Sequence, residues 1–404
     1  MAAPPVSAQP NASSTAGALR VFLDCNRCDF DYLRREIPFV NYVRDRTDAE
    51  LHILATTQAT GSGGMEYVFK FIGLDRFAGV DDELRYLAPP TGTEDERREG
   101  YAAVLKLGLV RYVTSTAAAD RLHLEYRPDG PAGEGPAGAV VDRWNFWSFR
   151  VRGSGSVNGE ASNSSRNLSS SVSANRTTEA WKINLNGALN FRTNEFTLNE
   201  GETLTDASHD HAVGGIVVKS VGDHWAVAAR GRLGSSTFLN QERAARLGAG
   251  VEYNVFPYSE SSRRQLTVQL TANVNHLKYL ERTVYGKEHE RVGDAVLLGA
   301  LDVRQPWGST GLSLEAATYF HDFGRHRVVA YGEIDVRLFK GLSLTVDGTG
   351  SRINDQLYLR AGAASDEEIL LRRRQLATSY RYRLAVGVSY TFGSMFNNVV
   401  NTRF

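Results

Sequence analysis

The chain contains two cysteines, Cys25 and Cys28, in a Cys-x-x-Cys pair. Such a pair at a strand end, just before a helix, could be a redox couple activated by the helix N-terminus. It could also be a structural disulfide formed in an oxidising compartment. A zinc site would need two more ligands, and none lies nearby at suitable spacing. Because no thioredoxin-like aromatic residue or proline accompanies the pair, the sequence favours the structural disulfide.

Histidines and carboxylates also occur together at 208–211, Ser-His-Asp-His, and at His321-Asp322. A His-x-His pair is able to hold a transition metal. Both groups fall in stretches that we expect to be loops, where incidental histidines are common. No specific catalytic motif accompanies either group. The sequence therefore predicts no enzyme, no metal site and no cofactor.

Many charged residues in the second half of the chain occupy alternate positions of candidate strands, on the polar face. One interpretation is an ion-pair network that fills a narrow lumen, and the other is a charged pore lining that selects ions. We expect Glu333, Asp335 and Asp347 to lie near Arg381 and Arg383. The complete predicted set is Arg150, Arg152, Arg230, Arg232, Glu252, Glu315, Glu333, Asp335, Arg337, Asp347, Arg381 and Arg383.

The stretch 379–392 shows most clearly which element positions these charges. One set of alternate residues, Tyr380 through Phe392, is apolar or aromatic, and the other set is polar, small or cationic. Successive side chains of a strand point to opposite faces, so the two sets lie on opposite sides of a sheet. An apolar band with aromatic residues at both ends is typical of a strand that crosses an outer membrane.

About twelve candidate strands follow one another from Trp144 onward, and helical patterns disappear. Short connections alternate with long polar ones, such as 195–210 and 354–373. Outer-membrane barrels have short periplasmic turns and longer external loops. A soluble β-sandwich or propeller also alternates, but its strands average five to six residues. The sequence therefore favours a mainly β protein, an antiparallel transmembrane β-barrel of about twelve strands.

The preceding residues, 20–127, form a different unit. A strand at 20–24, an amphipathic helix at 32–44 that Pro38 kinks or shortens, and a hairpin around Gly63 are expected. Thr93 and Glu96 form a capping box that begins a helix running to about Val113. This unit is a small α+β domain with its own core. We also expect a last strand at 122–126.

The boundaries that follow are a disordered N-terminal segment (1–19), the α+β domain (20–127), a Gly/Pro linker (128–143), the barrel (144–393) and a C-terminal tail (394–404). The first residues lack the basic and apolar regions of a signal peptide, so either an export signal lies upstream or the N-terminus is ordinarily disordered. No stretch of about 18 apolar residues suggests a transmembrane helix. The formal net charge of +0 implies no nucleic-acid partner.

The run from Ala385 to Phe392 resembles the C-terminal recognition signal of outer-membrane barrels, with Gly387, Tyr390 and Phe392 at its characteristic positions. Ala385 stands where a polar residue is usual, and residues 393–404 follow the run. The strand 181–192, with the Ser/Asn-rich strand before it, resembles the salt-stress-induced outer-membrane barrel family of Gram-negative bacteria. This resemblance covers roughly the second 260 residues. It implies an outer-membrane barrel and assigns no functional residue to this chain.

The expected partners are outer-membrane lipid, the barrel-assembly machinery and a periplasmic protein. An even number of strands puts both ends of the barrel on the short-turn side, so the α+β domain is expected in the periplasm. The first functional hypothesis is a barrel that anchors this domain, which docks a partner. The second is a narrow ion or small-solute diffusion channel. An enzyme at the barrel rim is the least favoured of the three.

Overall fold

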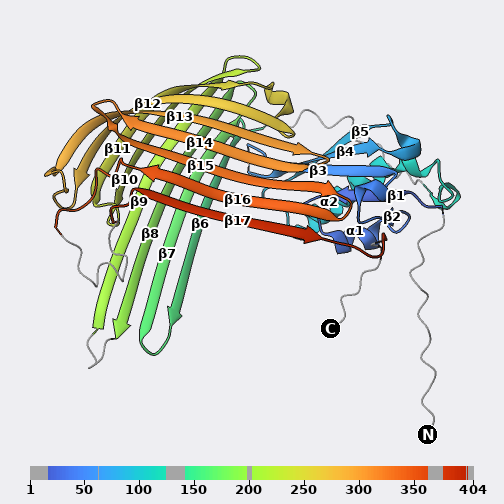
Figure 1. The fold of residues 1–404 in the computed structure, drawn as a ribbon, viewed down its shortest axis with the longest axis horizontal. Helices are drawn as coiled ribbons and strands as arrows, with labels where there is room; N and C mark the ends of the chain where they lie inside the picture. The colour runs from blue at the N-terminus through green and yellow to red at the C-terminus, as the bar shows by residue number, and fades with distance from the viewer. Residues whose placement is uncertain are drawn as a thin grey trace, which may run out of the picture.

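The computed structural model describes residues 17–61, 63–123, 142–197, 203–362, 376–396 and 398. The described chain forms a small α+β domain followed by a large antiparallel sheet (Figure 1). Most of the Gly/Pro linker (128–141) and most of the N-terminal segment lie outside the described residues. So do residues 124–126, which belong to the strand expected at 122–126; Leu122 and His123 are not in a strand.

A five-stranded sheet forms the base of the α+β domain, in the order β2-β1-β3-β4-β5. The β1 strand pairs in parallel with β2 and β3, and the β3, β4 and β5 strands form an antiparallel meander. The parallel β2 strand was not predicted, because a two-residue strand has no measurable alternation. The strands are β1 (Arg20–Asp24), β2 (Asn41–Tyr42), β3 (Leu51–Ala59), β4 (Met65–Gly73) and β5 (Asp82–Ala88).

Two helices, α1 (Phe30–Glu36) and α2 (Glu94–Val113), pack on this sheet. The α1 helix ends before Pro38, as expected from the missing N–H of proline. The capping box at Thr93 and Glu96 is present at the start of α2. The core between helices and sheet includes the fully buried Phe69 and Tyr112.

The second part is a twelve-stranded antiparallel sheet in which each strand pairs with its neighbours in sequence. Its strands are 11 to 18 residues long, longer than those of typical soluble sheets. They are β6 (Trp147–Gly159), β7 (Asn163–Thr177), β8 (Trp181–Thr197), β9 (Thr203–Ser220), β10 (Trp225–Ser236), β11 (Gln241–Asn254), β12 (Arg264–Tyr279), β13 (His289–Gln305), β14 (Gly308–Tyr319), β15 (Asp322–Phe339), β16 (Leu342–Ile353) and β17 (Tyr380–Tyr390).

The strand number and order agree with the predicted barrel, but the ring is not closed. The β6 and β17 strands are the two edges of the sheet and do not pair with each other. The sheet curls into an open trough, and β6 to β9 turn away from the later strands (Figure 1). The β6 edge contains Gly153, Gly155 and Gly159. Glycines weaken a strand and specify its register poorly.

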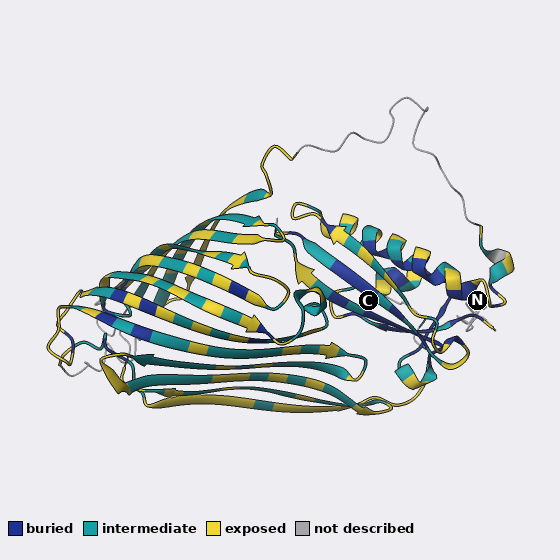
Figure 2. Cartoon of the chain, turned by 90° about the horizontal axis from the view of Figure 1, so that it is seen from above, coloured by how far each residue is buried: buried dark blue, intermediate teal, exposed yellow. Residues whose placement is uncertain are grey.

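The outward face of the sheet is apolar and exposed. On β17, Leu384 is 69% exposed and Val386 62% exposed, and most other exposed large hydrophobic residues also belong to the sheet. Burial alternates along the strands in Figure 2. Neither described helix combines the length and hydropathy of a membrane-spanning segment.

The loop predicted at 195–210 is largely wrong. The β8 strand continues to Thr197, and β9 begins at Thr203, so His209 and His211 lie in a strand. Their rings stack at 6.0 Å. The strand ends were missed because both faces are polar there, which removes the alternation. No cluster of three or more potential metal ligands occurs among the described residues.

Candidate functional site

The α+β domain lies against the end of the large sheet that carries the short turns (Figure 2). Arg337, near the end of β15, is the centre of this contact. Its two terminal nitrogens donate to the two carboxylate oxygens of Asp24 at 2.7 and 2.8 Å. Its guanidinium lies 5.0 Å from the centre of the Phe22 ring and also donates to the carbonyl of Pro306. A paired, planar arrangement of this kind fixes orientation as well as distance.

The turn between β15 and β16 adds a second set of contacts. Lys340 donates to Asp48 at 2.6 Å, and the backbone N–H of Gly341 donates to Asp45 at 2.7 Å. Gly341 has a φ of 76°, a conformation that glycine adopts without steric cost. The short turn thus presents both a side-chain donor and a backbone donor to the acidic residues around η1 (Arg46–Asp48).

Contacts elsewhere along the same end hold the β3–β4 side of the domain. Arg304 of β13 donates to the carbonyl of Thr57 at 3.1 Å, and Arg150 of β6 donates to that of Gly63 at 3.2 Å. Ser148 makes a longer contact with the carbonyl of Gly61. The domain is therefore held by strands from both halves of the sheet.

The described part of the C-terminal tail returns to the domain. Phe396 forms an antiparallel bridge with Val43 and packs beside Phe22 and Val43. Asn398 accepts a hydrogen bond from the backbone N–H of Tyr42 at 2.6 Å. The tail thus extends the edge of the five-stranded sheet next to β2. The sequence alone did not indicate where this tail binds.

His52 is fully buried behind Asp24 and belongs to the same group of contacts. Its Nδ1 accepts a hydrogen bond from Arg46 at 3.2 Å, so the proton of the neutral ring is on Nε2. Nε2 faces Asp24 at 3.5 Å, which is long for a hydrogen bond. Burial raises the pKa of Asp24, but the His52 ring and the Arg337 guanidinium beside the carboxylate outweigh burial and bring this pKa to about 2. Burial lowers the pKa of His52 despite the nearby Asp24 carboxylate.

These shifts predict an acid-sensitive domain. As the pH falls below 6.5, His52 of the unfolded chain binds a proton while the folded His52 stays neutral, so the free energy of unfolding decreases. The slope contributed by one such group approaches about 1.4 kcal/mol per pH unit. Asp24 stays ionised in this window and loses its contribution only between about pH 4 and pH 2. Thermal melting between pH 7.5 and pH 5 should show a steeper decrease for the wild type than for His52→Gln; equal decreases would contradict this assignment.

Cys25 and Cys28 form a disulfide at the end of β1. Cys25 is 4% exposed. Next to the disulfide is a cavity of about 490 Å³ between the domain and the large sheet, bordered by Asn26, Arg27 and Arg304. The buried sulfur and the closed bond favour the structural interpretation of the pair.

Replacing both cysteines with serine is expected to destabilise the α+β domain by about 2 kcal/mol, because the disulfide closes only a short loop. The measurement is the denaturant midpoint of the full chain with and without reductant. The contacts of Arg337 do not involve the disulfide, so docking should persist. An unchanged denaturant midpoint would contradict a stabilising role for the disulfide.

The predicted lumen charges do not form one network in the described residues; they take part in several separate contacts. Arg150 and Arg337 contact the α+β domain, and Asp347 pairs with Arg383 at 3.5 Å. The remaining partners are mostly local: Glu315 with Arg327, Glu252 with Tyr258 and Gln269, Glu333 with Tyr331, and Arg230 with Asn273. Within the described residues, the side chains of Arg152, Arg232, Asp335 and Arg381 form no hydrogen bond or ion pair.

The predicted assembly residues occupy the free edge strand and its end. Gly387 and Tyr390 belong to β17, and Phe392 follows it with its side chain 77% exposed. The rings of Tyr390 and Phe392 stack at 5.6 Å. Nothing in this geometry shows a partner bound to them, so their assembly role stays a prediction.

The sequence did not indicate Asp24, Asp45, Asp48 or His52 as site residues. The three aspartates have partners far along the chain: Arg337 follows Asp24 by 313 residues. Strand periodicity reports which face a residue occupies and carries no information on such pairs. The sequence offered one signal for Arg337: it lies near the end of a predicted strand, next to a short turn. A charged residue at that position of a barrel strand faces the mouth of the barrel as well as the lumen.

No protein-family model matches the chain, and no curated protein matches it. Among solved structures, the chain is similar to the NanC porin, with 9% identity, 60% of this chain and 99% of that chain covered, and a TM-score of 0.28. It is also similar to the beta domain of the Bordetella autotransporter BrkA, with 13% identity, coverage of 61% and 98%, and a TM-score of 0.25. Likeness at this level says nothing about ligand or activity.

Proposed function

We propose that this chain is an outer-membrane β-barrel protein that anchors the α+β domain on its periplasmic side as an interaction module. The observation that carries the proposal is the fixed docking of the domain through the paired contact of Arg337 with Asp24. A barrel that served only as a pore has no need of a domain fixed across its mouth.

The exposed apolar face of the large sheet supports the membrane location. A soluble monomer rarely exposes contiguous apolar surface on this scale, whereas lipid covers it in a barrel. Unpaired backbone groups are costly in hydrocarbon, so we expect β6 and β17 to pair with each other in the membrane form. The likeness of the sequence to the salt-stress-induced family agrees with this location and stays a prediction.

One surface of the α+β domain is free to bind a partner protein. Within the described residues, no hydrogen bond or ion pair joins α2 to the large sheet, and Leu107 on the outer face of α2 is 62% exposed. Exposed apolar side chains that no other described part of the chain covers are suited to protein contact. We propose that this side of the domain binds a periplasmic protein.

The proposed topology is tested with single cysteines and a membrane-impermeant thiol reagent in intact Gram-negative cells. A Leu107→Cys variant should react only after the outer membrane is permeabilised. A Lys287→Cys variant, in the exposed connection at the far end of the sheet, should react in intact cells. The native cysteines are joined to each other and do not react. Reaction of both variants in intact cells would contradict a periplasmic domain.

A narrow diffusion channel is the second candidate. The inward-facing Arg152, Arg232 and Arg381 have no charged partner among the described residues, which suits a pore lining. Planar-bilayer conductance distinguishes the two functions. Ohmic openings that change ion selectivity in Arg381→Glu would support the channel. If protein shown to be folded does not conduct, the channel function is contradicted and the anchoring function remains.

A further inference from the structure

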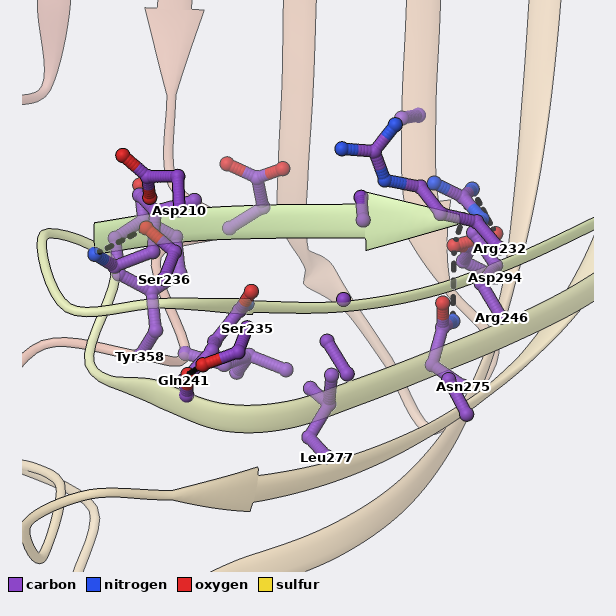
Figure 3. Close-up of a pocket in the computed structure, with 18 of the residues that line it drawn as sticks. Asp210, Arg232, Ser235, Ser236, Gln241, Arg246, Asn275, Leu277, Asp294 and Tyr358 are labelled. Carbon is purple, nitrogen blue, oxygen red and sulfur yellow. Dashed lines mark hydrogen bonds and ion pairs between the residues drawn. The ribbon is translucent and has the colours of Figure 1, made fainter. Parts of the chain in front are cut away.

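A cavity of about 480 Å³ lies on the inward face of the large sheet (Figure 3). Its lining residues belong to the end of the sheet away from the α+β domain. The segment after β16 covers part of it, with Leu357 and Tyr358 in the lining. Asn240 donates to the carbonyl of Tyr358 at 3.2 Å, and Arg360 donates to that of Thr237 at 2.9 Å. These contacts hold the segment in place, so the lumen here is a walled pocket of a size suited to a small molecule.

Most charges around the pocket already have partners. Asp294 accepts from Arg246 at 2.8 and 2.9 Å and also from the side chains of Asn273 and Asn275. Arg327 pairs with Glu315 at 2.8 Å and approaches Asp355 at 3.8 Å. These groups neutralise one another and form the wall of the pocket.

Two lining residues of opposite charge have no such partner. Asp210 of β9 and Arg232 of β10 form no hydrogen bond or ion pair through their side chains within the described residues, and both are exposed. Asp210 lies beside Ser236, and Arg232 lies at the other end of the group, near the Arg246–Asp294 pair (Figure 3). The strand register places Asp210 opposite Ser236, four residues from Arg232. This spacing corresponds to about 13 Å between Cα atoms.

We infer that this pocket binds a short peptide with free termini, with its ammonium group at Asp210 and its carboxylate at Arg232. Arginine is suited to a carboxylate because its guanidinium donates two parallel hydrogen bonds. A single amino acid carries both charged groups on one carbon and does not span the separation. The side chains of Asp210 and Arg232 reach inward, so their charged groups can lie closer together than their Cα atoms. A peptide of two or three residues, at roughly 3.3–3.6 Å per residue, matches that separation. The amide of Asn190, opposite Asp210 on β8, is placed to contact the peptide backbone.

This inference goes beyond the proposed anchoring function and does not depend on whether the barrel conducts. The test is isothermal titration of the full chain, folded in detergent, with three probes: trialanine, acetyl-trialanine-amide and alanine. Trialanine is expected to bind, and the capped peptide to bind at least tenfold more weakly, because each lost charge removes charge-assisted hydrogen bonds. Alanine, which cannot reach both charges, should also bind at least tenfold more weakly.

Variants assign the two ends of the peptide. Asp210→Asn and Arg232→Ala should each weaken trialanine binding at least tenfold, and Arg232→Ala should have little further effect on a peptide that is already amidated. Arg152→Ala, which removes an uncommitted charge on β6 outside the pocket, is the matched control and should bind as the wild type does. The proposal is overturned if folded protein does not bind trialanine, if the capped peptide or alanine binds equally well, or if Asp210→Asn and Arg232→Ala match the control.

Discussion

Replacing Arg337 with alanine is expected to release the α+β domain from the large sheet while both parts stay folded. The change leaves Asp24 as a partly buried carboxylate without its paired donor. Removing one member of such a charge pair costs about 3 kcal/mol, which shifts a docking equilibrium by roughly a hundredfold. Pulsed electron-spin distances between labels on α2 and on β15 should change from one narrow distribution to a broad one.

A double-mutant cycle separates the pair from general disruption. Asp24→Ala alone should also release the domain, and the Asp24→Ala/Arg337→Ala variant should cost less than the sum of the two single changes. Arg152→Ala is the control, since it removes an inward-facing arginine that has no partner in the described structure. Other contacts would have to fix the domain if the docking free energies lost in the two single variants simply add in the double variant. The same conclusion would follow if the distance between the α2 and β15 labels did not change in Arg337→Ala.

A charge on the outward face of β17 is expected to prevent stable insertion into lipid. Leu384 points outward and is 69% exposed in the isolated chain. Arginine on the lipid face of a barrel costs about 2–4 kcal/mol near the middle of the bilayer. Leu384→Arg should therefore lower the urea midpoint of the protein in phospholipid vesicles, as followed by the mobility shift of the folded barrel.

The neighbouring residue supplies the matched control. Ala385 lies on the opposite face of the same strand, opposite Asp347 of β16. Ala385→Arg places the same charge in the lumen, beside a carboxylate, and should leave the urea midpoint nearly unchanged. If both variants insert equally well, the apolar face does not contact lipid.

The strand order of the large sheet was accessible from the sequence because alternation of apolar and polar residues is a local property. Tyr380 to Phe392 show it without exception, and the capping box at Thr93 likewise marks the start of α2. Where both faces are polar, as at 203–210, alternation disappears, and a strand was mistaken for a loop. Closure of the ring is not a local property, and the glycine-rich β6 offers little to fix its register.

The site was less predictable, because it is made by contacts between distant segments. Arg337 was assigned to the lumen face, but its partner Asp24 belongs to another domain. The anchoring of Phe396 beside Val43 likewise joins the two ends of the chain. Asp294, held by Arg246 and two asparagines, was not singled out because its strand also carries apolar residues on the inward face. Pairs of this kind require the three-dimensional arrangement.

The most direct test of the central claim, a domain docked at the short-turn end of a membrane-inserted barrel, is a disulfide between positions 43 and 396. These residues form an antiparallel bridge, and the Cα separation of such a pair lies in the range that a disulfide spans. In outer-membrane fractions, Val43→Cys/Phe396→Cys should cross-link on mild oxidation, and Val43→Cys/Arg381→Cys should not. If both thiols of the first variant remain free in protein that has inserted, the domain does not dock there.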